Sequence, residues 1–136
     1  MPHFRFSEAA HLLGVSDDTI RRWVDAGMLS SSKDAVGRKV VDGAELAQFA
    51  KAQAHRIEDP IDVARSARNK FVGLVTEVIA DQVMAQVELQ CGTHRVVSLM
   101  SAEAVRELGL APGVLAVAVV KSTQVVVEVP AVDERG

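Results

Sequence analysis

The spacing of apolar residues changes near residue 60, and this change limits what the chain can fold into. Before it, apolar side chains recur at helical spacing, as in Ala9, Leu12 and Leu13. In the second half the chain is rich in valine, and residues 83–89 alternate between apolar and polar side chains, as in a half-buried β-strand. The sequence therefore predicts an α+β protein with a mainly helical N-terminal part and a β-rich C-terminal part.

The predicted domains are small. Of the 136 residues, we assign 1–56 to a helical domain, 57–65 to a linker that contains Pro60, 66–130 to a β-barrel and 131–136 to a disordered tail. Below about 80 residues a single core is only marginally stable, so we expect a homo-oligomer.

Composition excludes several classes of protein. The single cysteine, Cys91, excludes an internal disulfide and a thiolate zinc cluster within one chain, and we interpret it as a packing residue. The four histidines show no metal-ligand spacing, and no catalytic motif is visible. We therefore predict neither catalysis nor a metal site. The sequence has no signal peptide pattern and no apolar run of about 18 residues, so we expect a cytoplasmic protein without a membrane partner.

Two short helices are predicted at 7–13 and 17–26, with a glycine in the turn between them. Ser7 and Ser16 are candidate N-caps, and Gly14 and Gly27 should end the helices. This arrangement is typical of a helix-turn-helix.

The second of these helices has a packing face and a polar face. Ile20, Trp23 and Val24 should pack, and the polar residues Thr19, Arg21 and Arg22 lie off that face. Hydroxyl and guanidinium groups suit base edges and phosphates.

A basic hairpin should follow in residues 30–41. Gly37 lies near its tip, and Lys33, Arg38 and Lys39 supply positive charge. Beside a recognition helix, such a hairpin acts as a wing that contacts phosphate or the minor groove. A third helix, within 42–54, should close the small core.

The order of these residues resembles the winged helix-turn-helix of the MerR and excisionase family over about residues 4–53. The motifs are Ser7-Glu8-Ala9-Ala10, Leu13-Gly14-Val15-Ser16, Thr19-Ile20-Arg21-Arg22-Trp23, Gly27-Met28-Leu29, Gly37-Arg38 and Val41-Asp42-Gly43-Ala44-Glu45-Leu46. The resemblance implies that double-stranded DNA is bound by helix and wing, through Thr19, Arg21, Arg22, Arg38 and Lys39.

Two alternatives remain for these arginines. They are either DNA contacts or ordinary solvated charges, and Arg21 has Asp17 and Asp25 four residues away as candidate ion-pair partners. A helix-turn-helix domain of this size usually binds DNA as a dimer. MerR relatives commonly dimerise through a long helix, but residues 54–69 are too short and contain Pro60, so the dimer contacts must come from elsewhere.

The C-terminal part is predicted to be a five-stranded, OB-like barrel with one short helix. Strands are expected at 70–79, 82–91, 93–99, 114–121 and 124–129. The helix should span 102–108, with Ser101 as its N-cap and Gly109 at its end. Gly73, inside the first strand, would allow a bend or a close approach.

Hydroxyl and cationic side chains lie at the predicted ends of these elements. Ser66 and Arg68 precede the first strand, Ser101 opens the helix, and Lys121 and Ser122 lie in the turn between the last two strands. No carboxylate stands among these positions. This chemistry suits a tetrahedral dianion such as molybdate, tungstate, sulfate or phosphate. The alternative is that Arg68 and Lys121 are surface charges and Ser101 is only a helix cap.

Residues 64–130 look like the Mop or TOBE domain of molbindins and molybdate-responsive repressors. The motifs are Ser66-Ala67-Arg68-Asn69-Lys70 with Gly73, Leu108-Gly109-Leu110-Ala111-Pro112-Gly113 and Val120-Lys121-Ser122-Thr123-Gln124-Val125. In that family the oxyanion lies between subunits. The resemblance therefore implies binding by Ser66, Ala67, Arg68, Ser101, Lys121 and Ser122, with Ala67 acting through its backbone N–H. Met100 is larger and more apolar than expected beside such a pocket.

Together the two resemblances imply a transcription regulator that responds to molybdate or tungstate and assembles as a dimer or a higher oligomer, such as a hexamer. The alternative is an oligomeric molybdate store whose helical domain serves assembly or protein contacts. The formal net charge of the chain is −3, and the first 58 residues carry eight basic and eight acidic side chains, so overall charge does not favour DNA binding.

Overall fold

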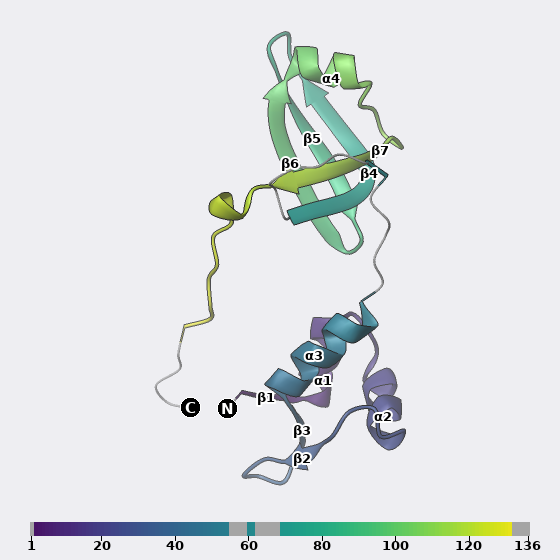
Figure 1. The fold of residues 1–136 in the computed structure, drawn as a ribbon, viewed down its shortest axis with the longest axis vertical. Coiled ribbons are helices and arrows are strands. Elements are labelled where there is room, and N and C mark those ends of the chain that lie inside the picture. Colours follow the sequence, from purple (N-terminus) through teal and green to yellow (C-terminus); the bar gives the residue numbers. More distant parts are fainter. Residues whose placement is uncertain (1, 55–59, 62–68, 132–136) are drawn as a thin grey trace. The chain divides into compact units, whose positions relative to one another are not determined.

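The computed structural model describes residues 2–54, 60–61 and 69–131. The chain divides into two compact units, residues 1–56 and 57–136. The first is a helical region with a small sheet, and the second is a curled antiparallel sheet with one helix (Figure 1). Most of the predicted linker, 57–65, and of the predicted tail, 131–136, lies outside the described residues.

Helix α1 (Phe6–Leu13) begins one residue earlier than predicted. Its N-cap is Arg5, so the prediction of Ser7 as the cap was wrong. The reason is Glu8, whose Oε1 accepts hydrogen bonds from the Arg5 backbone N–H at 3.0 Å and from Arg5 Nε at 3.1 Å. These bonds fix the first turn around Arg5. Gly14, with φ of 69°, ends the helix as expected.

Helix α2 (Asp17–Asp25) begins as the sequence predicts. The Ser16 Oγ accepts a hydrogen bond from the Thr19 backbone N–H at 3.2 Å, which satisfies one of the free donors of the first turn. Gly27, with φ of 78°, follows the helix and turns the chain. Helix α3 (Gly43–Gln53) is capped by Asp42, which accepts from the Glu45 backbone N–H at 3.0 Å.

A three-stranded antiparallel sheet completes the first unit. The predicted hairpin forms from β2 (Ser32–Lys33) and β3 (Lys39–Asp42), with Gly37 in its turn at φ of 83°. An additional strand, β1 (His3–Arg5), pairs with the other edge of β3, giving the order β1-β3-β2. Three residues are too few to show a period of two, so hydrophobic patterning did not predict β1.

One apolar core holds the first unit together. The predicted packing face of α2 is confirmed, because Ile20 is buried and Trp23 and Val24 pack against the cluster around it. The ring centroids of Trp23 and Phe49 lie 4.8 Å apart, which joins α2 to α3. The fully buried members of the cluster are Ala9, Ala10, Ile20, Leu29, Val41 and Leu46.

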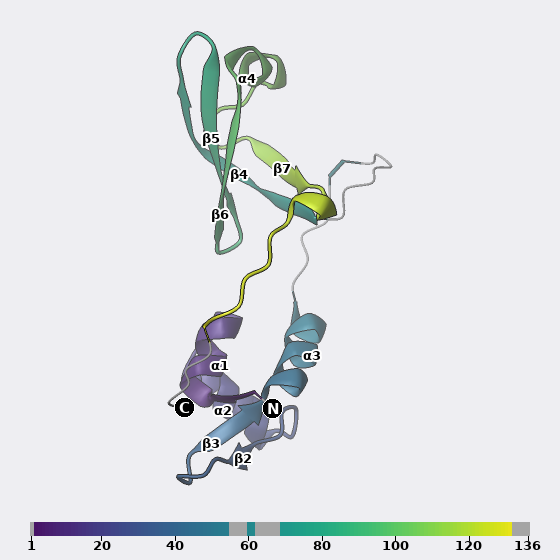
Figure 2. The same cartoon turned by 90° about the vertical axis from the view of Figure 1, so that its left-hand side faces the viewer.

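The second unit is a four-stranded antiparallel sheet in the order β6-β5-β4-β7. Its elements are β4 (Asn69–Ala80), β5 (Met84–Cys91), β6 (His94–Ser101), α4 (Ala102–Leu108), β7 (Leu115–Val120) and the short 3-10 helix η1 (Ser122–Gln124). The sheet curls around a core that includes Val75, Val87, Leu89 and Val105 (Figure 2). Ser101 caps α4 and Gly109 ends it, as predicted.

The predicted fifth strand, 124–129, was wrong. Gln124 ends η1, and residues 125–130 form no strand with any described part of the chain. The valines that suggested a strand are instead exposed, with Val126, Val127 and Val129 more than 80% accessible. Valine favours a strand only where a partner accepts its backbone hydrogen bonds. The sheet is therefore a half-barrel rather than a closed five-stranded barrel (Figure 2).

Candidate functional site

The outward face of α2 carries the first three predicted contact residues. Arg22 Nη2 donates a hydrogen bond to Thr19 Oγ1 at 3.1 Å, and that oxygen also lies 3.0 Å from the Ser16 Oγ. Among the described residues, no carboxylate pairs with Arg22, so its positive charge is not offset by a contact. This side chain is thus held by a neutral hydroxyl while its charge faces solvent.

Arg21 differs from Arg22 because a carboxylate holds it. Its Nη1 lies 3.2 Å from the Asp18 Oδ1, and both side chains are exposed. The sequence suggested Asp17 or Asp25 as partners, but the structure selects the residue three positions away. Residues three and four apart are both neighbours on a helix, and only the positions of the side chains decide between them. Part of the charge of Arg21 is therefore already offset.

The hairpin places Arg38 and Lys39 beside one another at the start of β3. Lys39 lies directly across from Lys33 in the strand register, and both side chains are exposed. Arg38 Nε lies 2.9 Å from the Asp34 Oδ2. The Arg38 backbone N–H donates to the Asp34 carboxylate, and together with the hydrogen bond from the Arg38 side chain this holds the pKa of Asp34 below its usual range.

Asp34 was missed by the sequence reasoning. The available signal was an acidic residue four positions before Arg38, across a turn that contains Gly37. Such a spacing is recognised readily on a helix. In a hairpin it brings side chains together only for a particular turn conformation, which the sequence pattern does not specify.

Ser101 lies at the junction of β6 and α4. Its Oγ accepts a hydrogen bond from the Ala104 backbone N–H at 3.0 Å. A hydroxyl that accepts at a cap still has its own proton to donate. The cap role and an anion-binding role are therefore chemically compatible, and the geometry leaves both alternatives open.

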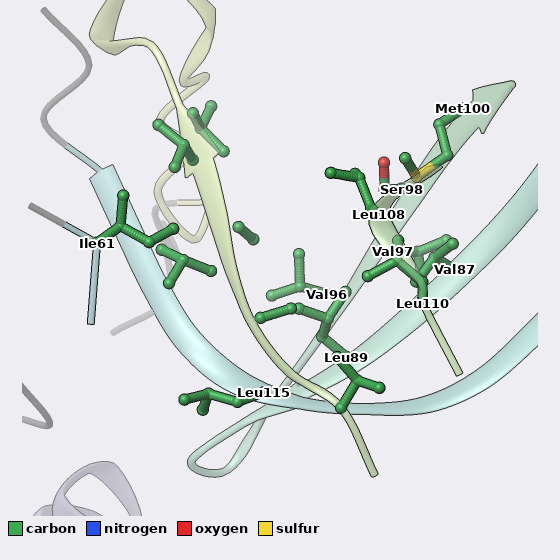
Figure 3. Close-up of a pocket in the computed structure, with 16 residues that line it drawn as sticks. Ile61, Val87, Leu89, Val96, Val97, Ser98, Met100, Leu108, Leu110 and Leu115 are labelled. Carbon is green, nitrogen blue, oxygen red and sulfur yellow. The ribbon is translucent and has the colours of Figure 1, made fainter. Parts of the chain in front are cut away.

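Met100, next to Ser101, belongs to the opposite face of β6. Figure 3 shows it in an apolar groove with Val87, Leu108 and Leu110, and it packs against the core of the second unit. Side chains alternate between the faces of a strand, so Met100 points into the groove while Ser101 is exposed. The size and apolar character of Met100 therefore have an ordinary packing explanation.

Lys121 and Ser122 follow β7 directly and are exposed. Within the described part of the chain, no hydrogen bond or ion pair holds the Lys121 ammonium group. Asn69, at the start of β4, pairs with Val120, and its Nδ2 donates to the Val120 carbonyl oxygen at 3.2 Å. The three other predicted oxyanion residues, Ser66, Ala67 and Arg68, lie outside the described residues.

Ser101 and Lys121 are placed by opposite ends of β4. Val120, which precedes Lys121, pairs with the first residue of that strand. Ser101 pairs with Met84 at the start of β5, and the next residue of β5 pairs with Ala80, the last of β4. The junction of β6 and α4, where Ser101 lies, and the start of η1, which follows Lys121, lie apart in both views (Figures 1 and 2). A single copy therefore does not bring Ser101 to Lys121.

The concave face of the curled sheet forms an open groove of about 480 Å³. Its lining is almost entirely aliphatic and comes from β5, β6, β7, the end of α4 with the segment that follows it, and Ile61 (Figure 3). The described residues contain no group of three or more histidine, cysteine, aspartate or glutamate side chains arranged for a metal ion. They also contain no helix whose length and hydropathy would let it cross a membrane.

Both halves of the chain match known families. Residues 4–54 match the helix-turn-helix domain family, and residues 65–127 match the TOBE domain family. No curated protein matches the chain.

Three solved structures are similar in sequence to the second half of the chain. MopII from Clostridium pasteurianum is 37% identical, covers 48% of this chain with 100% of its own length, and has a TM-score of 0.45. A molybdate-binding protein from Sporomusa ovata is 30% identical and covers 48% of this chain with 98% of its own, with a TM-score of 0.47. The cytoplasmic molybdate-binding protein ModG is 39% identical over 50% of this chain and 49% of its own, with a TM-score of 0.48.

Each family match falls within one of the two structural units, the helix-turn-helix match in the first and the TOBE match in the second. The N-terminal match covers the three helices and the hairpin, and the C-terminal match covers the curled sheet with its helix. The chain thus belongs to the TOBE family through its C-terminal unit, and its N-terminal unit matches the helix-turn-helix domain family.

Proposed function

We propose that this protein is a DNA-binding transcription regulator that responds to molybdate or tungstate. The observation that carries the proposal is the presence of a helix-turn-helix domain and a TOBE domain on one chain. The first supplies contacts to DNA, and the second supplies an oxyanion site. A protein that only stored the anion would need no DNA-binding domain.

Charges on the first unit support DNA binding. Lys33 and Lys39 face each other directly across β2 and β3, and like charges in that position destabilise a hairpin. A phosphate backbone would offset this repulsion. Arg22, which has no described carboxylate partner, adds a further cation on α2. With Thr19, Arg21 and Arg38, these residues form the proposed DNA contact surface.

The chemistry of the second unit supports an oxyanion site. The proposed ligand groups are the side chains of Ser66, Arg68, Ser101, Lys121 and Ser122 and the backbone N–H of Ala67. They offer two cations and several hydrogen-bond donors, which suit a tetrahedral dianion. The sequence motifs that carry the Mop resemblance, and the identities of 37% and 39% with MopII and ModG, favour molybdate as that dianion. Tungstate carries the same charge, so the site should also accept it.

The separation of Ser101 from Lys121 favours a site shared between copies. Because opposite ends of β4 place these two residues, a site that uses both takes Ser101 from one copy and Lys121 from another. Such a site requires a homo-oligomer, a dimer or a higher assembly such as a hexamer.

The exposed segment 125–129 supports the same conclusion. It is rich in valine, carries one charge, and lies free of any described strand. The outer edges of β6 and β7 leave unpaired backbone groups, which attract an additional strand. We propose that this segment pairs with the half-barrel of another copy and provides the contacts that hold the oligomer together.

In this proposal the anion controls DNA binding through the assembly. A ligand shifts an equilibrium only by its different affinities for the two states. An anion bound between copies would favour one arrangement of the second units, and so one spacing of the DNA-binding units. DNA half-sites have a fixed spacing, so affinity for DNA would change with the anion.

A storage or buffering protein is the second candidate. It is favoured by the even balance of acidic and basic residues in the first 58 positions and by the ion pairs that already hold Arg21 and Arg38. In that case the helical unit would serve assembly or protein contacts.

Two measurements on the full chain test the proposal and separate the candidates. Calorimetry with molybdate tests the anion site, and sulfate is the control. Lys121→Ala should weaken molybdate binding without unfolding the protein. Undiminished affinity in Lys121→Ala would refute the site.

Binding to fluorescent DNA at increasing salt concentration tests whether the protein is a regulator. A regulator loses orders of magnitude in affinity as salt rises and responds to molybdate, whereas a store shows no preferred DNA sequence.

A further inference from the structure

The two carboxylate oxygens of Asp34 serve different partners. Oδ1 accepts hydrogen bonds from the backbone N–H groups of Val36 at 3.0 Å and Arg38 at 2.8 Å. Oδ2 accepts from the Arg38 Nε at 2.9 Å. One oxygen therefore shapes the turn of the hairpin, and the other orients an arginine side chain.

The turn itself is held by further bonds between the same residues. The Asp34 backbone N–H donates to the Arg38 carbonyl oxygen at 2.8 Å, and the Gly37 N–H donates to the Asp34 carbonyl oxygen at 3.0 Å. Arg38 is thus fixed at its backbone and at its Nε. Its Nη1 and Nη2 groups make no hydrogen bond with the described residues, so both remain available to a ligand.

An arginine whose side chain is already oriented contributes more free energy to binding through the same contact. An untethered arginine loses rotamer freedom when it binds, and a preoriented one loses less. The carboxylate of Asp34 also repels the DNA backbone, so the pair adds little to general attraction. Orientation of the Arg38 side chain strengthens binding only at DNA sequences that offer a partner in the right place, whereas the charge of Asp34 weakens binding to every sequence. The pair therefore raises the ratio of specific to non-specific affinity rather than the total affinity.

We propose that Asp34 is a positioning residue that aims the Arg38 guanidinium at one site on the DNA and so contributes to sequence discrimination. This inference rests on the proposed DNA-binding function. It concerns Arg38 alone, and Lys33 and Lys39 supply the sequence-independent attraction of the hairpin.

Asp34→Asn separates the two roles of the carboxylate. Asparagine keeps an Oδ1 that accepts from Val36 and Arg38, so the turn is retained. Its Nδ2 is a donor and cannot accept from the arginine Nε. The amide NMR signals of Val36 and Gly37 should therefore keep their hairpin shifts in this variant, and this measurement checks that the turn is intact.

The experiment measures a ratio of affinities in a double-mutant cycle. The full chain is used to select duplexes from a random-sequence pool, and the best duplex is compared with a scrambled duplex of equal length. Asp34→Asn should lower the ratio of the two affinities roughly threefold to tenfold. In the Arg38→Ala background the same substitution should leave the ratio unchanged, because no arginine remains to be aimed.

The ratio also removes the effect of net charge, since loss of one negative charge strengthens binding to both duplexes alike. Glu107→Gln is the matched control, because Glu107 is an exposed acid on α4, outside the proposed DNA contact surface, with no ion pair described. It should leave the ratio unchanged.

The possible failures are distinguishable. An unchanged ratio in Asp34→Asn, or equal falls with and without Arg38, would overturn the role of Asp34 while leaving DNA binding intact. If Arg38→Ala had no effect on either duplex, the hairpin contact itself would be wrong, and Asp34 would lose its role with it. Failure of the unaltered protein to bind any duplex would overturn the proposed function and this inference together.

Discussion

Gly73 lies against the backbone of Gln90 so closely that no side chain fits between them. A Cβ placed at Gly73 would be 2.3 Å from the Gln90 carbonyl oxygen and 2.7 Å from the Cys91 Sγ. The sequence predicted a bend or a close approach at this glycine, and the close approach is confirmed. It lets β4 curl tightly over β5, which gives the half-barrel its shape.

Replacing Gly73 should therefore destabilise the second unit. Gly73→Ala forces the two strands apart, and overpacking of this kind costs about 1–3 kcal/mol of unfolding free energy. Urea unfolding followed by circular dichroism measures the change. Glu77→Ala, at an exposed position of the same strand, is the matched control and should have a small effect. Equal unfolding midpoints for Gly73→Ala and the unaltered protein would contradict the close packing.

Arg22→Ala and Arg38→Ala should each weaken DNA binding and leave anion binding intact. An arginine that reads a base edge contributes about 1–3 kcal/mol to binding, and one that contacts phosphate contributes a salt-dependent part. Fluorescence anisotropy with a selected duplex measures the first effect, and calorimetry with molybdate measures the second. Arg106→Ala, which removes an exposed arginine from α4, serves as the control for charge. Unchanged DNA affinity in both variants would remove α2 and the hairpin from the contact surface.

Ser101 allows the cap role to be separated from anion binding. Aspartate is as good an N-cap as serine, so Ser101→Asp should keep α4 and the stability of the second unit. Its negative charge should abolish molybdate binding by repulsion. Ser101→Thr should retain both properties, because threonine keeps the hydroxyl. Thermal unfolding measures the stability of each variant, and calorimetry measures its affinity for molybdate. Normal molybdate binding by Ser101→Asp would mean that Ser101 acts only as a helix cap.

The hairpin should loosen in acid. The backbone N–H and side chain of Arg38 lower the pKa of Asp34 from its usual 3.8. A carboxyl whose pKa is lowered by folding stabilises the folded form above its unfolded pKa, and that contribution disappears as pH falls through the folded value. The carbon-13 shift of the Asp34 carboxyl should therefore titrate below pH 3.8, together with the Val36 amide. In Arg38→Ala the titration should move upward. A midpoint at or above 3.8 in the unaltered protein would be inconsistent with the observed pair.

Val127→Asp should disrupt the oligomer. In an extended strand Val127 shares a face with Val125 and Val129, while Val126 shares the other face with Glu128. An aspartate at 127 would place a charge against an apolar surface, which is costly. Size-exclusion chromatography with light scattering should show a lower mass for Val127→Asp, and Val126→Asp is the control that should assemble normally. Normal assembly of both variants would mean that the segment does not hold the copies together.

Local interactions made much of the fold predictable. Ser16 and Ser101 cap their helices through bonds to residues three positions ahead, so neighbouring residues suffice to identify them. The α2 packing face follows from helical spacing in the same way. The prediction of a fifth strand at 124–129 was wrong because a strand also needs a pairing partner, and the valine-rich pattern of that segment does not show whether one is present.

The candidate sites show the same limit. Thr19, Arg22 and Lys39 could be chosen from residue type and position along the predicted elements. The pairs Arg21 with Asp18 and Arg38 with Asp34 depend on which rotamer and which turn form, and residue spacing does not settle either. For the oxyanion site, the motifs supplied the residues. The strand pairing then placed Ser101 and Lys121 by opposite ends of β4, which no motif could indicate.

The exposed valines at 125–129 have a consequence for how such a protein would behave in a cell. In the proposed assembly these valines are covered only when two copies associate. The fraction of the protein that is assembled and able to bind the anion therefore depends on protein concentration. The melting temperature should then rise with protein concentration. The abundance of the protein would become a second input beside the anion, and a cell could set the threshold of the response by how many copies it makes.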